Sequence, residues 1–371
     1  MNNEILYQVA LSQVKGIGPL VAKNLISYCG SAKAVFDTPL GKLSKIPGVG
    51  NKLISFLKTG NTPALAQADE IVTTALKQNI QILIYTDKLY PYRLKQIADG
   101  PNILYYKGSA NLQANRCIAI VGTRKASSYG KDVLNKLLEA WQAYQPTIIS
   151  GLAYGIDITA HKKALDLGLP TIGVMATGLD SVYPQAHQRY AQQMLEQGGL
   201  LTEYPFGTKP DAYNFPARNR IIAGISQATI VIEAAIKGGA LITANLARDY
   251  DREVYATPGS LYNEVSAGCH KIIAEQVAQL LYKPEQLIED LGWTAGEAID
   301  AQTELPDFSS LTTEQRNIAE LLQKQPEGIH IDNLVIKSGL AFSTLSTYLL
   351  ELEFSGWVRA LPGKKYQLVR K

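Results

Sequence analysis

The chain has 371 residues, of which 46% are hydrophobic and 19% are charged, and its formal net charge is +3. This length allows two or three domains with substantial buried cores, and the composition excludes an intrinsically disordered chain or a small disulfide-held scaffold. No apolar run approaches the roughly 18 residues that a membrane-spanning helix needs, so a membrane protein is excluded as well.

The N-terminus and the cysteines indicate a cytoplasmic protein. The first residues contain no basic segment followed by an apolar stretch and a small-residue cleavage site, so we interpret the sequence as mature protein. Cys29, Cys117 and Cys269 lie far apart and form no CxxC pair, which predicts reduced thiols rather than disulfides or a zinc site. The four histidines form no HxH or HExxH motif, and we expect no metal and no cofactor.

Residues 1–62 are predicted to form a helical domain built on an internal repeat. Residues 14–19 (VKGIGP) and 46–51 (IPGVGN) lie 32 residues apart, and an apolar-periodic helix follows each. Two glycines separated by one apolar residue allow a tight hairpin between helices, whose amides can hold a phosphate-sized anion. The repeat resembles the helix-hairpin-helix (SAM-like) family of DNA-backbone binders, and residues 1–60 carry a net charge of +5. A packing domain in which the glycines only cap helices is the alternative.

Residues 63–288 are predicted to form an extended Rossmann-like α/β domain. After a helix-like stretch at 64–78, short apolar runs rich in β-branched residues alternate with helix-like segments of ten or more residues. The expected strands are 80–85, 117–121, 147–149, 171–175, 200–203, 229–232 and 253–257, and the expected helices include 130–144, 158–167, 187–197 and 241–250. Such alternation is typical of a parallel sheet with helices on both faces, in which ligands sit beyond the carboxyl ends of the strands.

The loops expected at those strand ends are rich in glycine. They are residues 121–124 (VGTR), 150–157 (SGLAYGID), 176–180 (ATGLD) and 237–240 (KGGA). None is GxGxxG and no GxxxxGK[ST] occurs, which removes a dinucleotide fingerprint and a P-loop, and leaves amide-lined turns suited to phosphates. Because residues 61–308 have a net charge of −4, a few placed cations, rather than bulk charge, would have to attract a nucleic acid there.

One segment among these loops, residues 215–224 (FPARNRIIAG), combines arginines with an aromatic ring. Arg218 and Arg220 supply guanidinium groups that can bind phosphates through paired hydrogen bonds, and Phe215 supplies a ring on which a base can stack. These are the components of single-strand recognition. Together with Arg124 in the first glycine turn, these residues predict a binding site for a single strand. The alternative is that Arg218 and Arg220 pair with carboxylates and hold the loop in place.

The end of the chain is predicted to be a winged helix-turn-helix domain at 309–371. Residues 284–310 lack periodicity, and we expect a linker at 289–308. Three helices and a two-stranded ribbon follow, at 313–322, 331–337, 343–354 and 357–369. The third helix carries two Glu and no Lys or Arg, which favours contact with a protein over reading of duplex DNA, because base and phosphate contacts depend on basic side chains. A transcriptional regulator that binds DNA through this domain is therefore disfavoured.

Several long motifs occur in the order found in the DNA-processing protein A (DprA, Smf) family, which this chain resembles over nearly its whole length. The motifs are residues 121–124, 150–157 with 160–161, 177–180 with 183–184, 202–205, 215–224, 241–244 and 258–259. The resemblance implies a non-enzymatic protein that binds single-stranded DNA, forms a homodimer through its Rossmann-like domain, and loads RecA onto incoming strands during natural transformation. Two places depart from the family pattern: many relatives have Ser-Gly-Ser where residues 238–240 read GGA, and some relatives have a lysine that contacts DNA where Gln185 stands.

The resemblance also implies which residues line the DNA-binding pocket. They are Gly122, Thr123, Arg124, Phe215, Arg218, Asn219 and Arg220, with Ser150 and Gly151 adjoining. We expect the three arginines and the loop amides to grip successive phosphates while Phe215, and Tyr213 as a further candidate, pack against bases.

An enzyme is the competing hypothesis. At the level of the fold, the middle segment also resembles nucleotide phosphoribohydrolases, in which glycine turns hold a mononucleotide phosphate and a strand-end Glu assists bond cleavage. Glu233 is the strand-end carboxylate that could take this part. Those enzymes carry a Pro-Gly-Gly-x-Gly-Thr loop, which this chain lacks.

Overall fold

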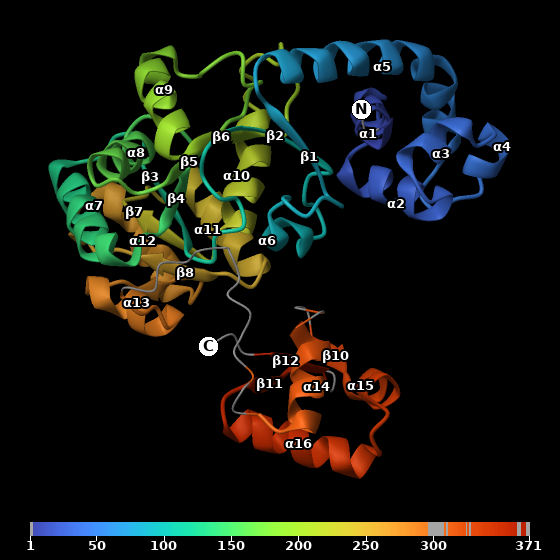
Figure 1. Cartoon of the computed structure of the whole chain (residues 1–371). Helices are drawn as coiled ribbons and strands as arrows, with labels where there is room; N and C mark the ends of the chain where they lie inside the picture. The colour runs from blue at the N-terminus through green and yellow to red at the C-terminus, as the bar shows by residue number, and fades with distance from the viewer. Residues whose placement is uncertain are drawn as a thin grey trace. The chain divides into compact units, whose positions relative to one another are not determined.

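The computed structural model describes residues 3–295, 308, 311–323, 325, 328–361 and 365–368. The chain divides into two compact units, Met1–Ile299 and Asp300–Lys371 (Figure 1). The first unit is a helical front followed by a large mixed sheet with helices on both faces, and the second is a winged helix. The predicted fold class is therefore confirmed.

The front helices contain the predicted repeat as two matching hairpins. They are α1 (Asn3–Gln13), α2 (Pro19–Cys29), α3 (Ala32–Asp37), α4 (Leu40–Leu43) and α5 (Asn51–Lys77). The first glycines of the two hairpins, Gly16 and Gly48, have φ of 82° and 85°, which glycine adopts without strain. The second glycines, Gly18 and Gly50, are the N-caps of α2 and α5, with φ/ψ of −85°/176° and −86°/170°. The repeated sequence thus produces the same backbone twice.

Helix α5 joins two stretches that the sequence predicted as separate helices. It continues through Pro63, which removes one backbone hydrogen-bond donor without ending the helix. Its buried residues Ala64 and Ala68 belong to a core that also includes Ile103 and Tyr105 of the sheet. The boundary expected at residue 62 therefore falls inside one helix and does not separate two cores.

The sheet has nine strands in the order β1-β2-β6-β5-β4-β3-β7-β8-β9. The strands are β1 (Gln81–Ile84), β2 (Ile103–Gly108), β3 (Cys117–Gly122), β4 (Thr147–Ser150), β5 (Thr171–Val174), β6 (Gly199–Thr202), β7 (Ala228–Ile232), β8 (Glu253–Ala256) and β9 (Gln279–Leu280). All pairs from β6 to β9 along the sheet are parallel, whereas β2 pairs antiparallel with both β1 and β6. Sequence reasoning missed β2 and β9: β2 pairs antiparallel and lies outside the regular alternation of strands and helices, and β9 has only two residues.

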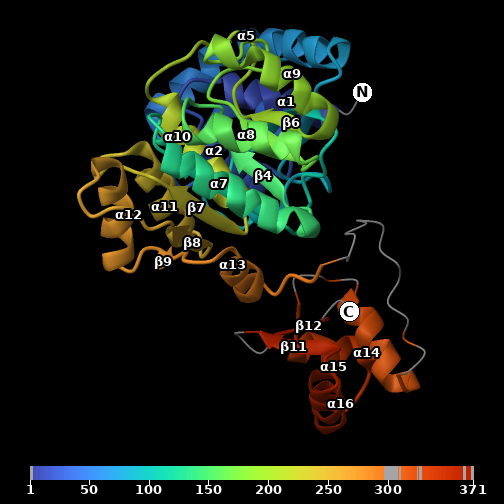
Figure 2. The same ribbon diagram turned by 90° about the vertical axis from the view of Figure 1, so that its left-hand side faces the viewer.

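Helices cover both faces of this sheet, as predicted. They are α6 (Tyr92–Lys95), α7 (Ser128–Trp141), α8 (Ile156–Asp166), α9 (Gln188–Gln197), α10 (Asn214–Ile225), α11 (Gly239–Asp249), α12 (Glu264–Ala274) and α13 (Pro284–Leu291), with short 3₁₀ turns at Gln142–Tyr144 and Gln185–His187. Alternate residues of β3 point to opposite faces: Ile118 and Ile120 pack with α7 and α8 (Figure 2), and Ala119 and Val121 pack with α10 and α11.

The order of the strands creates a crevice at the carboxyl ends of β3 and β7. From β3 the chain proceeds outward through β4, β5 and β6, and then returns to pair β7 on the other side of β3. Loops that leave neighbouring strands in opposite directions open a space between them, which is where ligands bind in sheets of this kind.

Part of the segment expected to lack structure is a helix. In α13, Leu287 and Ile288 are buried, and the Trp141 indole nitrogen donates to the Pro284 carbonyl at 2.9 Å. The prediction for residues 284–291 was therefore wrong, because tertiary packing stabilises a helix too short to show a clear periodicity. Most of the expected linker, including residues 296–307, lies outside the described residues.

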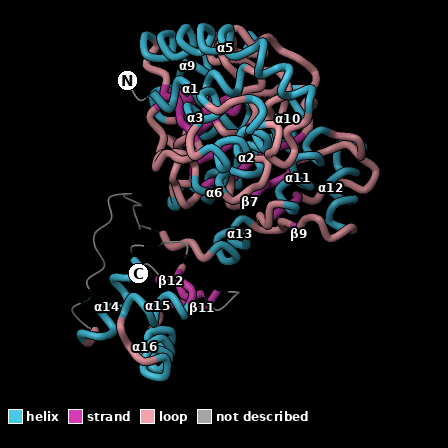
Figure 3. The backbone as a smooth tube through the Cα atoms, turned by 90° about the vertical axis from the view of Figure 1, so that its right-hand side faces the viewer, coloured by secondary structure: helices cyan, strands magenta, loops and turns pink. Residues whose placement is uncertain are grey.

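The second unit has the three helices and the ribbon of the predicted winged helix (Figure 3). Its elements are α14 (Thr313–Gln323), β10 (Ile329–His330), α15 (Ile331–Ser338), α16 (Phe342–Phe354), β11 (Val358–Leu361) and β12 (Lys365–Leu368). The strands form an antiparallel sheet in the order β10-β12-β11. Leu345, Leu349 and Leu352 of α16 are buried in the core of this unit.

Three further properties concern membranes, metals and thiols. In the part of the chain that the structure describes, no helix has the length and apolar character needed to span a bilayer. Within the same residues, His, Cys, Asp and Glu side chains do not gather in groups that could hold a metal ion. Cys117 and Cys269 are buried free thiols and Cys29 is a half-buried one.

The buried His161 is expected to make stability depend on pH. Its Nδ1 lies 2.7 Å from the Thr171 hydroxyl, and burial lowers the pKa of its imidazole to about 3. Because an unfolded histidine takes up a proton near pH 6.5, this group favours folding above that pH and opposes it increasingly as the pH falls toward 3, by up to about 1.4 kcal/mol per pH unit. We expect His161→Gln to flatten the dependence of the unfolding free energy on pH between 6.5 and 5. Urea unfolding at fixed ionic strength measures this, and equal slopes in the two proteins would contradict it.

Candidate functional site

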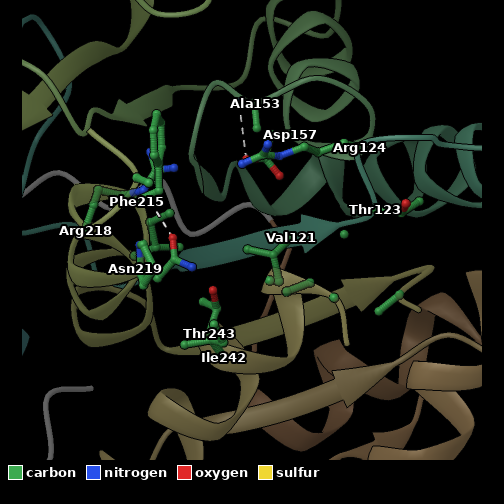
Figure 4. Close-up of a pocket in the computed structure, with 18 of the residues that line it drawn as sticks. Val121, Thr123, Arg124, Ala153, Asp157, Phe215, Arg218, Asn219, Ile242 and Thr243 are labelled. Atoms are coloured by element: carbon green, nitrogen blue, oxygen red, sulfur yellow. Dashed lines mark hydrogen bonds between the residues drawn. The ribbon is translucent and has the colours of Figure 1, made fainter. Parts of the chain in front are cut away.

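A cleft of about 650 Å³ opens beyond the carboxyl ends of β3 and β7 (Figure 4). It brings together turns and helix starts that are far apart in the sequence. Its lining residues are Val121, Gly122, Thr123, Arg124, Ala153, Asp157, Tyr183, Pro210, Asp211, Ala212, Phe215, Pro216, Arg218, Asn219, Ile222, Ala234, Ala235, Gly238, Gly239, Ala240, Ile242 and Thr243. The cleft is therefore at the sheet edge that the strand order predicts.

The turn after β3 forms the floor of the cleft and is held rigidly. A Cβ on Gly122 would lie 2.1 Å from the Ile232 carbonyl oxygen, so only glycine allows β3 and β7 to meet here. The amide of Thr123 donates to the Glu233 carbonyl at 2.7 Å, and the Thr123 carbonyl accepts from the amide of Ile156 at 3.1 Å. These bonds tie the turn to β7 and to α8, and so determine where the next side chain points.

That next side chain, Arg124, is exposed and lies over an aromatic platform. Its guanidinium carbon is 6.0 Å from the centre of the Phe215 ring, and Phe215 in turn packs against Tyr183 with ring centres 5.6 Å apart. Arg124 forms no ion pair with any other described residue, so its donors remain available. Tyr183 was missed as a site residue, because its contact with Phe215 joins segments 32 residues apart and only the Tyr-Pro motif singled it out.

Arg218 also lines the cleft, but most of its hydrogen-bonding capacity is used inside the protein. It is 4% exposed, and its Nη1 donates to the carbonyl of Gly151 at 2.8 Å and to that of Val174, while its Nε contacts Asn219 Oδ1 at 3.2 Å. A Cβ on Gly151 would lie 2.7 Å from both Arg218 Nη2 and Asp157 Oδ2, so the two charges face each other across this glycine. Burial lowers the pKa of Arg218 to about 10 against the opposing effect of Asp157, and burial raises the pKa of Asp157.

The structure does not place Arg220 beside Arg124 and Arg218, where the sequence predicted it. Arg220 is absent from the cleft lining; its guanidinium pairs with Glu203 and donates to the Asp99 carbonyl at 2.6 Å. Sequence reasoning placed residues 218–220 in a loop, whereas they belong to α10, where side chains two positions apart point in very different directions. The structure shows Arg220 in an ion pair, as the alternative predicted.

Two other predicted residues support the cleft from beneath without lining it. Ser150 is fully buried and its hydroxyl donates to the Ile120 carbonyl at 2.6 Å, and Gly151 accepts from Arg218. The structure thus places six of the nine predicted residues together on the cleft surface. They are Gly122, Thr123, Arg124, Phe215, Arg218 and Asn219. The further candidate Tyr213 is 86% exposed and lies outside the lining.

The opposite wall is the start of α11, which sequence reasoning quoted as a glycine turn but left out of the site. Gly238 is the N-cap of this 11-residue helix, and Gly239 and Ala240 follow in its first turn. The free amides of a helix start favour an anion. Ile242, which is 44% exposed, adds an apolar surface to the same wall (Figure 4).

Glu233, the candidate acid or base of the enzyme hypothesis, is turned away from the cleft. It is 2% exposed; its carboxylate accepts from the Ser127 hydroxyl and, at 2.9 Å, from the Ser127 amide. A Cβ on Gly130 would lie 2.4 Å from Glu233 Oε2. The carboxylate therefore anchors the start of α7, where Ser127 is the N-cap.

Removing this anchor is expected to destabilise the protein. Ser127→Ala deletes both the N-cap hydroxyl of α7 and a donor to the buried Glu233, which together cost about 1–2 kcal/mol. Urea unfolding measures the loss, with Ser128→Ala as the matched control because Ser128 is exposed and follows the cap. Equal unfolding midpoints for the two variants would contradict this role.

Comparison with known proteins relates the chain to a family. The family model described as DNA recombination-mediator protein A matches residues 81–292, and the DprA winged helix domain matches residues 302–364. Protein Smf of Synechocystis sp. is 33% identical, over 99% of this chain and 99% of that protein. The X-ray structure of DprA from Streptococcus pneumoniae is similar at 32% identity with a TM-score of 0.66, covering 78% of this chain and 98% of that one.

A second solved structure concerns the single-stranded DNA binding mode of DNA processing protein A from Helicobacter pylori. It is 27% identical to this chain, with a TM-score of 0.53, and the match covers 58% of this chain and 97% of that one. The chain belongs to the DNA recombination-mediator protein A (DprA, Smf) family of DNA-processing proteins.

Proposed function

We propose that the protein binds single-stranded DNA in the cleft between β3, β7 and α10. The observation that carries the proposal is Arg124, an exposed arginine without an ion-pair partner among the described residues, which lies over the ring of Phe215, and that ring packs against Tyr183. A cation beside an exposed aromatic face matches the phosphate and the base of one unpaired nucleotide. The amides at the start of α11 supply a second place for a phosphate on the facing wall.

The preference for single strands follows from stacking. A base that stacks on an aromatic side chain contributes about 1–3 kcal/mol. In a duplex the bases already stack on each other, so a ring can gain this energy only after a base has been pulled out. Arg218 adds its positive charge at the edge of the cleft, although Asp157 offsets much of it.

In the cell we propose that the bound strand is passed to RecA during natural transformation, with the protein acting as a homodimer. This part of the proposal rests on membership of the family and on the relative from Helicobacter pylori that is described by its single-stranded DNA binding mode. Two copies would double the number of binding sites that can contact one strand. Once one site has bound the strand, the second site meets it at a high effective concentration, which raises the overall affinity. We propose no catalytic role for the protein, because the carboxylate of Glu233, the candidate acid or base, is buried and accepts hydrogen bonds from Ser127.

Competition binding tests the proposal. A labelled oligo-dT of about 16 nucleotides is bound to the full chain and then challenged with unlabelled oligo-dT, with a duplex of equal length, or with thymidine monophosphate. We expect the single strand to compete at least about tenfold better than either alternative. Equal competition by the duplex would contradict the proposal. Release of free base from nucleoside monophosphates, followed by chromatography, would favour the enzyme instead.

A further inference from the structure

Aromatic side chains continue beyond the cleft along one side. Ala153 and Tyr183 line the cleft, and Tyr154, the residue after Ala153, is 51% exposed. The Tyr154 ring packs edge-on against His187, with ring centres 4.9 Å apart, and His187 Nδ1 lies 2.7 Å from the Leu152 carbonyl oxygen. Tyr154 therefore has a fixed support on one side and a ring open to solvent on the other.

A second contact repeats this pairing farther from the cleft. The Lys162 ammonium lies 4.4 Å from the centre of the Tyr190 ring. Lys162 is eight residues after Tyr154, and Tyr190 is three residues after His187, so both contacts join the α8 segment to the start of α9. Tyr154 lies two residues before α8 begins, Lys162 lies in the second turn of that helix, and Ile158 between them is buried against α9. The two contacts thus follow each other along one surface, over roughly 9 Å of α8.

This surface carries an ammonium that is unpaired among the described residues, with the exposed Asp166 one turn farther along α8. Lys162 is exposed and forms no ion pair with any residue that the structure describes, whereas the adjacent Lys163 is paired with Glu139. The acidic residue at the start of α8, Asp157, is buried beside Arg218 and does not compete for the same surface. An available ammonium therefore follows an exposed ring along a path that begins at the cleft.

We propose that the single strand leaves the cleft along this surface, which we call the α8–α9 strip and define as Tyr154, Lys162 and Tyr190. A base stacks on Tyr154, and Lys162, positioned by the ring of Tyr190, contacts a phosphate farther along the strand. The inference rests on the proposed function, because it extends the path of the same ligand. It also predicts that affinity rises with strand length beyond what the cleft alone can hold.

Fluorescence anisotropy of the full chain with oligo-dT of about 4 and about 16 nucleotides tests the strip, since these lengths bracket common site sizes. For Tyr154→Ala we expect the Kd for the long strand to rise about fivefold or more, while the Kd for the short strand stays within twofold. For Lys162→Ala we expect the dependence of log K on log salt to fall by roughly 0.7 with the long strand alone. Tyr154→Phe keeps the ring and should bind as the parent does, and Lys163→Ala is the matched lysine control.

Three results would overturn the strip: equal loss at both lengths in Tyr154→Ala, no loss at either length, or equal effects of Lys162→Ala and Lys163→Ala. Arg124→Ala separates these from failure of the proposed function, because it should weaken both lengths whether or not the strip exists. A parent protein that binds neither strand would overturn both proposals. Thermal unfolding of each variant verifies that the loss concerns a folded protein, and Lys162→Ala, at an exposed position, retains the test if Tyr154→Ala does not fold.

Discussion

Arg124→Ala is expected to weaken binding of oligo-dT about tenfold or more without changing the stability of the protein. The side chain is exposed and its interaction within the protein is with the Phe215 ring, so its loss leaves no buried group without a partner. A charge-assisted contact with one phosphate disappears, and the ring beneath loses its cation. Anisotropy across a salt series measures the effect, and the slope of log K against log salt should fall by roughly 0.7.

The neighbouring Lys125 provides the control for this prediction. It is also exposed and basic, but it lies outside the cleft lining. Lys125→Ala should therefore bind oligo-dT within about twofold of the parent, since a solvated side chain outside the lining makes no direct contact in the cleft. Arg124→Lys should fall between the two, because an ammonium retains the charge and loses the planar fork. Equal losses of affinity for oligo-dT in Arg124→Ala and Lys125→Ala would contradict binding of the strand in the cleft.

Arg220→Met is expected to have the opposite profile, with a large loss of stability and little loss of binding. The side chains of Arg220 and Glu203 are 13% and 14% exposed, and they pair with each other inside the protein. Removing one partner leaves the Glu203 carboxylate buried without its counter-charge, which costs about 3–5 kcal/mol. Urea unfolding measures the loss, and anisotropy on the folded fraction should give a Kd within about twofold of the parent.

A double-mutant cycle identifies the cause. Arg220→Met combined with Glu203→Gln removes both charges, so the pair should be less destabilised than the sum of the two single variants. If Arg220→Met instead abolished binding while leaving the unfolding free energy unchanged, Arg220 would be a DNA contact, as the sequence pattern indicated, and the ion pair would be incidental.

The sequence by itself determined the class of the fold and the edge of the sheet that forms the cleft. Short length and β-branched content distinguish strands buried on both faces from helices, and the alternation of the two favours parallel pairing with crossovers. The repeated glycine pattern at 14–19 and 46–51 specifies the same hairpin twice, since positive φ at Gly16 and Gly48 is a local property of the backbone. The three helices and ribbon of the second unit follow from the same local signals.

Tertiary structure alone decided what each arginine does. Arg124, Arg218 and Arg220 look equivalent in the sequence, yet one is exposed over a ring, one lies buried opposite Asp157, and one is paired with Glu203. It likewise decided that Tyr183 supports Phe215 and that α5 continues through its proline. The physical reason is that periodicity and turn preference arise from neighbours along the chain. The partner of a charge or a ring, in contrast, comes from distant segments that only the folded chain brings together.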